Sequence, residues 1–321
     1  MNLKFAFAAL VGLFIVIGLV VHQGVAQVAE PLGQAGSRLG LVCLLHLPPL
    51  ACSALAWQVL LGYTWQRSTW MFMGVRGIRE AATLLPVAQI GGELVGARVL
   101  TIYGCRASVA GASVVVDLTL EVVAQFVFTL AALALLVLLG HYNGTLHAFV
   151  TGVLIAGFLL LGFVLAQHLG LFKLLERLLQ KMAIGRPDVG LTDLAGLHDT
   201  ILEIYRHGWR LFWSGALHLL SWVLTSGEVW LALWLMGHPV TFAQAFIVFS
   251  LGHAVRSAAF VIPSGLGAQE AGFMVVGAMC SLPPEVALAA SLAIRVREVV
   301  LGVPGLLAWN VLEGSRVWAN R

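Results

Sequence analysis

The chain has 321 residues, of which 60% are hydrophobic and only 10% are charged. Soluble globular domains carry about 25% charged residues, so this composition excludes an ordinary soluble protein. The net charge of +3 gives no sign of a nucleic-acid partner, because the basic residues lie in loops beside apolar segments. The sequence predicts an all-α, polytopic integral membrane protein, a helical bundle with one transmembrane domain over residues 1–321.

A helix needs about 20 residues to cross the hydrocarbon core of a bilayer, which is about 30 Å thick. Stretches of about this length and of low charge occur at Phe5–Val21, Leu39–Leu61, Ser108–Leu139, Ala148–Gln167, Leu211–Met236, Phe242–Ile262 and Ala287–Trp309. Two further apolar stretches, Glu80–Leu100 and Pro263–Leu282, are interrupted by glycine and proline. We therefore expect seven or eight spans together with two broken or re-entrant segments.

The first apolar stretch has some features of a signal peptide, because Lys4 precedes it and small residues follow at Gly24–Ala29. Its length exceeds the usual apolar region of a signal peptide, which is about 7 to 15 residues, and no clean A-x-A cleavage site follows. We therefore expect Met1–Val21 to be the first membrane helix.

Basic residues in short loops are retained on the cytoplasmic side of a membrane. The densest basic segment is Lys173–Arg210, and a second cluster consists of Arg67, Arg76 and Arg79. The loop His141–His147 carries no lysine or arginine. These observations predict that the N-terminus and the long central loop are cytoplasmic, and they leave the side of the C-terminus open.

The central loop, about residues 169–208, begins with a stretch in which polar and apolar residues alternate at helical spacing, from Leu171 to Met182. Such a helix lies along the membrane surface. It is either an interfacial strut between two spans or a basic surface for anionic lipid or for biosynthetic proteins. The loop is too short for a catalytic domain.

The sequence contains none of the motifs that carry soluble-enzyme chemistry. Its four cysteines form no C-x-x-C pair, and its ten histidines form no H-E-x-x-H pattern. A nucleophile elbow, a Walker loop and a dinucleotide fingerprint are also missing from it. We therefore expect no metal site, no cofactor and no catalytic residue of these kinds.

The polar residues inside the apolar stretches carry more information. Asp117 and Glu121 are four residues apart, hence on one helical face, and Gln125 follows one turn later. A carboxylate at the centre of a bilayer costs about 2.5 to 3.5 kcal/mol, so such residues face a bundle interior or a watery cavity. The two acids either line a transport pathway or pair with Arg98 or Arg106 near the cytoplasmic end.

The first interrupted stretch, LLPVAQIGGELVGARVL, contains Pro86, Gly92 and Glu93. Proline and paired glycines disfavour a continuous helix, and broken helices mark binding sites in transporters. The alternative is a cytoplasmic linker before the next span.

The second interrupted stretch, VIPSGLGAQEAGF, contains Pro263, Gly265, Gly267 and Glu270 in a similar arrangement. Seven positions separate the proline from the glutamate in both stretches, and in both a further glutamate follows 28 positions later, at Glu121 and Glu298. This spacing predicts a twofold internal repeat, unless so few matching residues agree by chance.

The last span carries Arg295, Arg297 and Glu298, and Arg256 precedes the second break. An arginine offers a planar fork of donors that suits phosphate or carboxylate, so an anionic lipid headgroup is one candidate ligand. The alternative is that these residues neutralise one another in a buried cluster.

These segments, together with SVVVDLTLEVVAQ, resemble the flippase-like family that includes the transmembrane domain of lysylphosphatidylglycerol synthases. The run LAIRVREVVLGVPGLLAW is most similar to the branch that accompanies hopanoid-biosynthesis genes in Gram-negative bacteria. The resemblance extends from about Leu39 to Trp309. Ser264 departs from it, since the family loop favours a smaller residue such as glycine.

The resemblance implies a bundle with re-entrant helices that moves or presents lipid in the bacterial inner membrane, with hopanoid or a related lipid as cargo. It carries over to Pro86, Gly92, Glu93, Asp117, Glu121, Pro263, Gly265, Gly267 and Glu270. The synthases have a soluble aminoacyl-transfer domain after the membrane part, and we do not expect that activity from a chain that stops at Arg321.

The leading hypothesis is a lipid transporter or flippase, in which protonation of Asp117 or Glu121 couples movement to protons. One alternative is an intramembrane enzyme that modifies a lipid headgroup, with Glu93, Asp117 or Glu121 as general base and an arginine that binds phosphate. Another is a scaffold for hopanoid-biosynthesis proteins. The sequence leaves the oligomeric state open.

Overall fold

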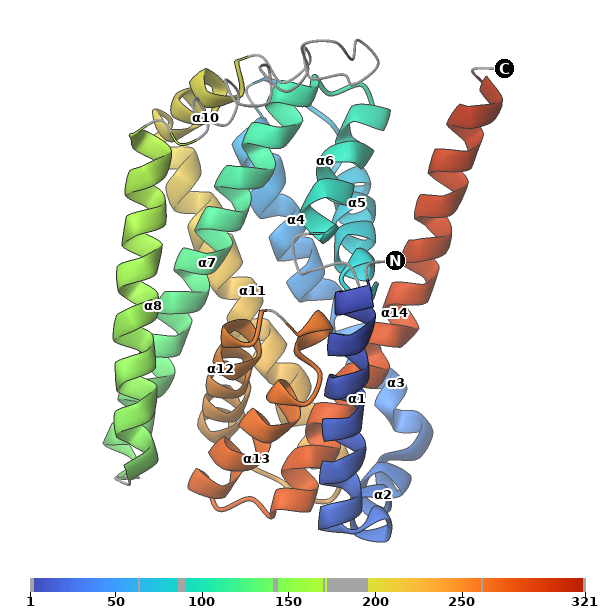
Figure 1. Cartoon of the computed structure of the whole chain (residues 1–321), viewed down its shortest axis with the longest axis vertical. Coiled ribbons are helices and arrows are strands. Elements are labelled where there is room, and N and C mark those ends of the chain that lie inside the picture. Colours follow the sequence, from blue (N-terminus) through green and yellow to red (C-terminus); the bar gives the residue numbers. More distant parts are fainter. Residues whose placement is uncertain are drawn as a thin grey trace.

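The computed structural model describes residues 3–62, 64–85, 91–140, 144–169, 171, 196–260 and 262–319. Every regular element in this part of the chain is a helix, and most helices run along the long axis of the molecule (Figure 1). The predicted all-α architecture is therefore confirmed for the described residues.

Four helical stretches in the described part are long and apolar enough to cross a membrane: Val25–Leu61, α7 (Ala107–Leu138), His147–His168 within α8 (Gly144–His168), and α11 (Gly208–Leu235). The first of them is divided into α2 (Val25–Ala35), the 3-10 turn η1 (Gly36–Leu39), α3 (Gly40–Leu45) and α4 (Leu47–Leu61). This establishes a multi-pass membrane protein. The count of seven or eight spans stays a prediction.

The remaining helices include shorter ones and one long C-terminal helix. They are α1 (Leu3–Gln23), α5 (Thr69–Ala82), α6 (Gly91–Ile102), α10 (Leu197–Tyr205), α12 (Phe242–Ala258), α13 (Ala268–Met279) and α14 (Pro284–Ala319). The predicted surface helix Leu171–Met182 falls almost wholly on residues 172–195, which lie outside the described residues.

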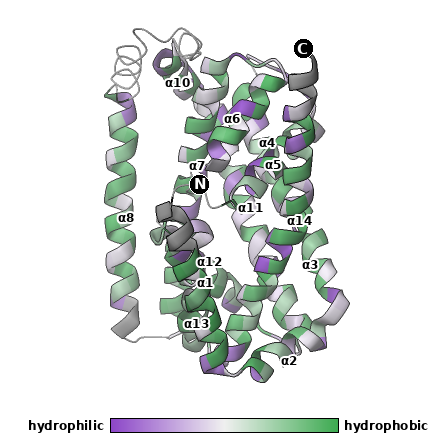
Figure 2. Cartoon of the chain, turned by 45° about the vertical axis from the view of Figure 1, so that its right-hand side comes forward, coloured by the Kyte–Doolittle hydropathy of each residue, from purple (hydrophilic) through white to green (hydrophobic). Residues whose placement is uncertain are grey.

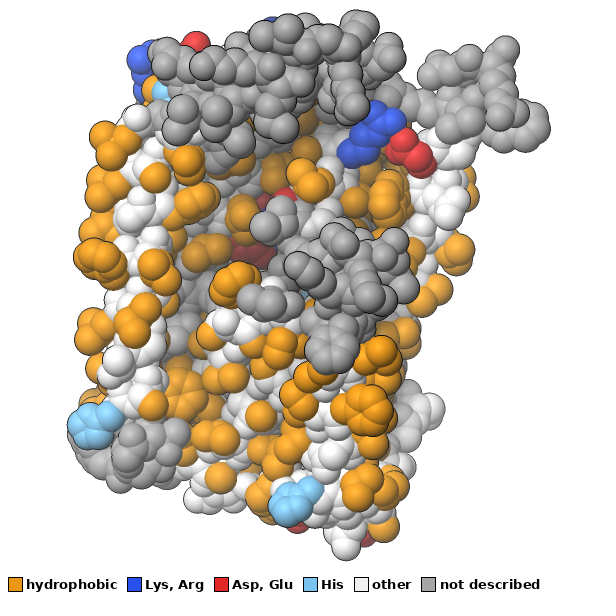
Figure 3. Space-filling view, viewed as in Figure 1, with side chains coloured by type: hydrophobic (Ala, Val, Ile, Leu, Met, Phe, Trp, Pro, Cys, Tyr) orange, Lys and Arg blue, Asp and Glu red, His pale blue; other side chains and the backbone are white. Residues whose placement is uncertain are grey.

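The outer surface of the bundle is apolar. Figure 3 shows hydrophobic side chains over most of one face, and Figure 2 shows α8 as largely hydrophobic along its length. Helix α8 packs against α7, and only 6% of its most apolar stretch, within His147–His168, is buried inside the protein. Large exposed side chains such as Phe158 would be costly in water, so this surface is built to contact lipid.

The chain leaves the helical conformation in both stretches where proline and glycine interrupt the sequence. Helix α5 ends at Ala82 and α6 begins at Gly91, while Pro86 and its neighbours 87–90 lie outside the described residues. Helices of 14 and 12 residues are about 21 and 18 Å long at 1.5 Å per residue. Each is therefore shorter than the hydrocarbon core of a bilayer.

The second break lies between α12 and α13. A 3-10 turn at Pro263–Gly265 separates the two helices, and Ser264 has a φ of 54° in the left-handed region. Glycine adopts this conformation without steric cost, which explains why the family resemblance implies a glycine at the position of Ser264. Glu270 then caps α13, because its carboxylate accepts a hydrogen bond of 2.8 Å from the Gly267 amide.

The segments α4–α7 and α11–α14 have the same order, in which one helix is followed by two short helices and one long helix. Within each segment the two short helices pack on each other, and the second of them packs on the long one. Each segment also packs on the other, because α5 contacts α14 and α12 contacts α7. In Figure 1, α5 and α6 occupy the upper half of the bundle and α12 and α13 the lower half.

The two breaks meet inside the bundle. The Ser264 hydroxyl at the second break donates a hydrogen bond of 2.8 Å to the Thr83 carbonyl, which follows the end of α5 at the first. A hydrogen bond between residues 181 positions apart ties the two breaks into one region of the protein.

Helix α14 approaches α5 closely through Gly305. A β-carbon at this glycine would lie 2.7 Å from the Ala81 β-carbon and 3.0 Å from the Gly77 carbonyl oxygen. We expect Gly305→Val to lower the free energy of unfolding by about 1 to 3 kcal/mol, because the added atoms force two backbones apart.

Gly314 on the same helix is the matched control, since a β-carbon there meets nothing within 4 Å. Thermal unfolding of both variants in one detergent checks the prediction. Equal melting temperatures for Gly305→Val and Gly314→Val would contradict the packing described above.

Candidate functional site

Among the residues that the structure describes, fourteen charged or chargeable side chains form ion pairs inside the bundle, and we call this set the ion network. It consists of Arg76, Arg79, Arg256, Arg295, Arg297, His46, His218, Glu80, Glu93, Asp117, Glu121, Glu228, Glu270 and Glu298. Ionised groups are expensive to bury, so a protein that buries them must pair them.

The first part of the network joins α5 to α7. Arg76 and Arg79 lie one turn apart on α5, and Asp117 and Glu121 lie one turn apart on α7, so each pair shares a helical face. Arg79 Nη1 is 2.5 Å from Asp117 Oδ2, and Arg76 Nη2 is 2.5 Å from Glu121 Oε1. The crossed contacts, 3.3 Å and 3.1 Å, complete a square of four ion pairs.

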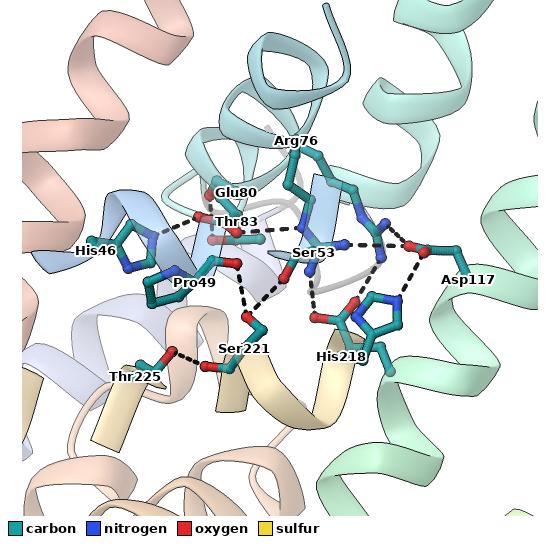
Figure 4. A network of polar contacts seen from close by, with 12 residues as sticks. His46, Pro49, Ser53, Arg76, Glu80, Thr83, Asp117, His218, Ser221 and Thr225 are labelled. Atoms are coloured by element: carbon teal, nitrogen blue, oxygen red, sulfur yellow. Dashed lines mark hydrogen bonds and ion pairs between the residues drawn. The ribbon is translucent and has the colours of Figure 1, made fainter. Parts of the chain in front are cut away.

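Two more side chains extend this square. Glu93 on α6 places Oε2 2.7 Å from Arg79 Nη2, and His218 on α11 places Nε2 2.9 Å from Asp117 Oδ1. Asp117 therefore contacts two arginines and a histidine, and it is completely buried. Figure 4 shows His218 and Arg76 both directed at this carboxylate.

The second part of the network joins α12, α13 and α14. Arg256 Nη1 is 2.5 Å from Glu298 Oε1, and Arg295 bridges Glu298 at 3.2 Å and Glu270 at 2.9 Å. Arg295 also donates hydrogen bonds to the carbonyls of Ser264 and Gly265, at 2.7 and 3.2 Å. The arginine thus satisfies backbone groups that the break leaves outside the helix.

A third group of contacts links the two segments through the turn between α3 and α4. His46 Nδ1 lies 2.8 Å from Glu228 Oε1, and its Nε2 lies 3.1 Å from Glu80 Oε2 (Figure 4). Arg297 on α14 also contacts Glu228, at 3.1 Å. Carboxylate oxygens only accept hydrogen bonds, so the imidazole donates to both of them only when it carries both of its protons, whereas Arg297 Nη1, which lies 3.4 Å from Nε2, can only donate to that nitrogen.

One ion pair occurs in both segments at the same spacing. Arg79 pairs with Glu121, and Arg256 pairs with Glu298, in each case across 42 positions. The two arginines are 177 positions apart, and so are Glu93 and Glu270. The similarity between the two segments therefore includes an arginine and an ion pair, in addition to the proline and the two glutamates of the sequence pattern.

A polar cavity of about 270 Å³ lies between the two parts of the network. Its charged and imidazole-bearing lining residues are His46, Arg76, Glu80, Glu121, His218, His253, Arg256, Arg297 and Glu298. Hydroxyl groups of Ser53, Ser221 and Thr225 also line it. Residues from both segments contribute to its wall, among them Thr83 at the first break and Gln269 in the first turn of α13, next to the second break.

An apolar groove of about 920 Å³ lies beside this cavity, between α7, α8, α12 and α13. Its wall consists almost wholly of apolar side chains such as Phe126, Phe149 and Leu159. Gln125 and Ser257 also line it, and the Gln125 amide donates a hydrogen bond of 2.8 Å to the Ser257 hydroxyl. Helices α7 and α12 therefore separate the groove from the polar cavity.

Comparison with known proteins identifies the family of this chain. The family model for the lysylphosphatidylglycerol synthase TM region matches residues 3–305. The chain belongs to the lysylphosphatidylglycerol synthase transmembrane-region family. Membership of this family indicates a lipid-related function in a membrane. No curated protein and no solved structure matches the chain.

The structure brings most of the residues that the family resemblance selects into one region. Glu93, Asp117, Glu121 and Glu270 are members of the ion network, as are Arg256, Arg295, Arg297 and Glu298. Gly265 and Gly267 have positive φ at the second break, and Pro263 begins its turn. A β-carbon at Gly92 would lie 2.6 Å from the Arg79 carbonyl oxygen, so glycine allows α6 to approach α5.

Arg98 is the exception among the described site residues. Its guanidinium pairs with Glu313 at 2.6 Å, and the two side chains are 49% and 39% exposed. It contacts neither Asp117 nor Glu121, whose partners are Arg76, Arg79 and His218, so the alternative in which these acids pair with Arg98 or Arg106 is wrong.

Sequence reasoning misassigned two residues and missed four. Arg76 and Arg79 were predicted to be loop residues that orient the chain, but they are buried on α5 and pair with α7. The residues missed are His46, Glu80, His218 and Glu228. The available signal was helical spacing: Arg76 and Arg79 are three residues apart and Asp117 and Glu121 are four apart. Each pair therefore fits one face of its own helix, and the two faces carry opposite charges.

The pairing limits the chemistry of this family member's site. Glu93, Asp117 and Glu121 each contact an arginine, so none of them is a free general base. Among the described residues, no group of three or more histidine, cysteine, aspartate or glutamate side chains has the arrangement of a metal site.

Removal of Arg79 should destabilise the protein strongly. Its side chain is 4% exposed and contacts three carboxylates, so Arg79→Gln leaves buried negative charges without a partner. We expect a loss of about 3 to 5 kcal/mol in the free energy of unfolding.

The control is Arg98→Gln on the neighbouring helix, where loss of an exposed pair should cost at most about 1 kcal/mol. Denaturant or thermal unfolding in a common detergent distinguishes the two. If both variants unfolded at the same temperature or denaturant concentration, the ion network would not be a structural requirement.

Proposed function

We propose that this protein moves lipid between the two leaflets of the bacterial inner membrane. The observation that carries the proposal is the position of a polar cavity of about 270 Å³ next to an apolar groove of about 920 Å³ inside a membrane protein of a lipid-related family. A lipid has a polar head and apolar chains, and these two spaces suit the two parts.

The two spaces share the walls formed by α7 and α12. Glu121 on α7 and Arg256 on α12 face the cavity, while the adjacent residues Val122 and Val255 line the groove. A head in the cavity and chains in the groove would therefore lie on opposite sides of the same helix pair. Passage of the connecting part of the lipid requires α7 and α12 to separate where Gln125 and Ser257 are bonded.

The two breaks are proposed to be re-entrant segments of an inverted repeat, α4–α7 and α11–α14. The matching order of helices, the shared spacing of Arg79 with Glu121 and Arg256 with Glu298, and the contacts of α5 with α14 and α12 with α7 support this. In repeat-built transporters, movement of one repeat against the other exposes a site to each side in turn.

Finer features of the proposal rest on sequence. The similarity of the C-terminal run to the hopanoid-associated branch supports hopanoid or a related lipid as cargo. The basic loop supports a cytoplasmic N-terminus, although Arg76 and Arg79 no longer contribute to that argument because they are buried. The whole chain is proposed to form one transmembrane domain.

We propose that any coupling to protons acts on the histidines rather than on Asp117 or Glu121. Protonation of either acid would leave a buried arginine without a counter-charge. His46 and His218 each contact a carboxylate and line the cavity, and histidine is the side chain that most often carries protons in such pathways.

The two other functional classes lack a supporting observation. An intramembrane enzyme would need a free base, and the candidate carboxylates are paired with arginines. A scaffold would dock partners through Leu171–Met182, and residues 172–182 of that segment lie outside the described residues.

A side chain that fills the polar cavity should stop lipid movement. Gly77 on α5 lines the cavity, and a β-carbon there meets nothing within 4 Å, so Gly77→Leu fills the space without a clash at its first atom. We expect movement of fluorescent lipid in proteoliposomes to fall at least about tenfold, with little change in melting temperature.

Gly74 on the same helix is the matched control, since it is exposed, has equal room and does not line the cavity. Gly74→Leu should keep wild-type movement. Unaltered movement in Gly77→Leu, or absence of movement of any lipid in the wild type, would refute the proposal.

The groove makes a separate prediction. Gly152 on α8 lines the groove with open space at its β-carbon, and Gly162 on the same helix has open space but does not line it. Gly152→Trp should slow lipid movement several-fold because the indole occupies the space proposed for acyl chains, whereas Gly162→Trp should have no effect. If the two tryptophan variants moved lipid at equal rates, the groove would not be on the pathway.

A further inference from the structure

The charges that a ligand in the polar cavity would meet are unequally accessible. Glu80 has the most exposed ionised side chain on the cavity wall, at 36%, whereas Arg76, Arg297 and Arg256 are only 5%, 10% and 13% exposed. A ligand in the cavity therefore has more access to this carboxylate than to any of the three arginines. A carboxylate accepts hydrogen bonds and repels anions.

The arginines that reach the cavity are also already engaged. Arg76 contacts three carboxylates, Arg256 contacts Glu298 and donates a hydrogen bond of 2.7 Å to Gln269, and Arg297 contacts Glu228. The charge of each arginine on the wall is already offset by a carboxylate, so an anionic headgroup gains a full ion pair with an arginine only by displacing that carboxylate. The displaced carboxylate would then lie unpaired in a low-dielectric interior, which costs several kcal/mol.

The ion network as a whole has no surplus positive charge. Five arginines and two histidines, His46 and His218, face seven carboxylates. The sum of charges therefore does not exceed zero even when both imidazoles are counted as positive. His253, which also lines the cavity, packs on Trp222 and Phe249 and has no ion pair with a described residue.

The remaining polar groups on the wall suit hydroxyl groups of a ligand. The Ser53 and Ser221 hydroxyls are 2.9 Å apart, and Ser221 donates to the Pro49 carbonyl at 2.9 Å. Each hydroxyl oxygen can accept a further hydrogen bond, as can the exposed Glu80 carboxylate. The accessible wall is thus richer in acceptors than in free donors.

We infer that the cavity selects a lipid head that carries hydroxyl groups and no net charge, and that it rejects a net anion. This inference rests on the proposed function, because it takes the cavity to be the headgroup site. It chooses between the two ligand classes that the sequence leaves open, and it chooses against an anionic lipid because the arginines have carboxylate partners inside the protein.

The test compares two lipids that have the same acyl chains and hydroxylated heads, an uncharged glucosyl diacylglycerol and the anionic phosphatidylglycerol. Binding of an equimolar mixture to the purified full-length protein is measured by native mass spectrometry, and leaflet exchange of fluorescent forms is measured in proteoliposomes. We expect the wild type to prefer the uncharged lipid by at least about tenfold, because the arginines on the wall already have carboxylate partners and the Glu80 carboxylate repels an anion.

Removal of one carboxylate should change the preference. Glu298→Gln deprives Arg256 of its counter-charge at the cavity wall, so the preference should shift toward phosphatidylglycerol by about tenfold. The double variant Arg256→Gln and Glu298→Gln removes both members of that pair and should recover the wild-type preference. Glu313→Gln on the same helix removes a carboxylate outside the cavity and should have no effect.

The outcomes separate this inference from the proposed function. Preferential binding of phosphatidylglycerol by the wild type, or an unchanged preference in a folded Glu298→Gln, would overturn the inference whether or not lipid moves. Preferential binding of the uncharged lipid with no leaflet exchange would uphold the inference about the head and count against transport. Melting temperatures establish that each variant is folded.

Discussion

The structure depends on the mutual neutralisation of arginines and carboxylates in the interior of a membrane protein. Asp117 is completely buried, and without Arg76, Arg79 and His218 it would be an isolated charge in an apolar bundle. Such a charge costs several kcal/mol even after relaxation. The helices α5, α7 and α11 are therefore held in one relative position by the requirement that these groups remain in contact.

The same requirement explains the breaks. A helix that ends inside the membrane leaves carbonyl and amide groups without partners, and these must be satisfied by protein. At the second break Arg295 binds the Ser264 and Gly265 carbonyls, and Glu270 binds the Gly267 amide. The charges that pair across helices thus also stabilise the irregular backbone, so one set of residues performs both tasks.

The arrangement also ties ligand binding to helix position. The cavity exists because two parts of the network, one from α5 and α7 and one from α12 and α14, leave a space between them. Any ligand that competes for Glu80 or Glu298 changes the pairing of His46 or Arg256. His46 precedes α4, which packs on α11, and Arg256 lies on α12, which packs on α7, so both residues lie beside contacts between the two segments. Such exchange of partners is a physical route by which a lipid head could shift the balance between two arrangements of the helices.

The sequence by itself determined the membrane character, the helical class and the points at which helices stop. A chain of this apolar composition is stable only in lipid, and inside lipid the backbone must form helices. Proline with paired glycines disfavours a helix in any surroundings. The membrane character and the ends of the helices therefore depend only on local chemistry. The acid pair of α7 also followed from local spacing, and the expectation of a glycine at the position of Ser264 came from the family resemblance. The family resemblance found the carboxylates for the same reason.

Only the tertiary structure decided which charges meet. Arg76 and Arg79 have the same charge and spacing on a loop and on a buried helix, and the positive-inside rule favoured the loop. His46, Glu80 and Glu228 come together from α5, α11 and the turn before α4, and no local pattern relates them. Contacts of this kind arise from the packing of distant helices, and a ligand's preference for charge depends on those contacts rather than on the residues alone.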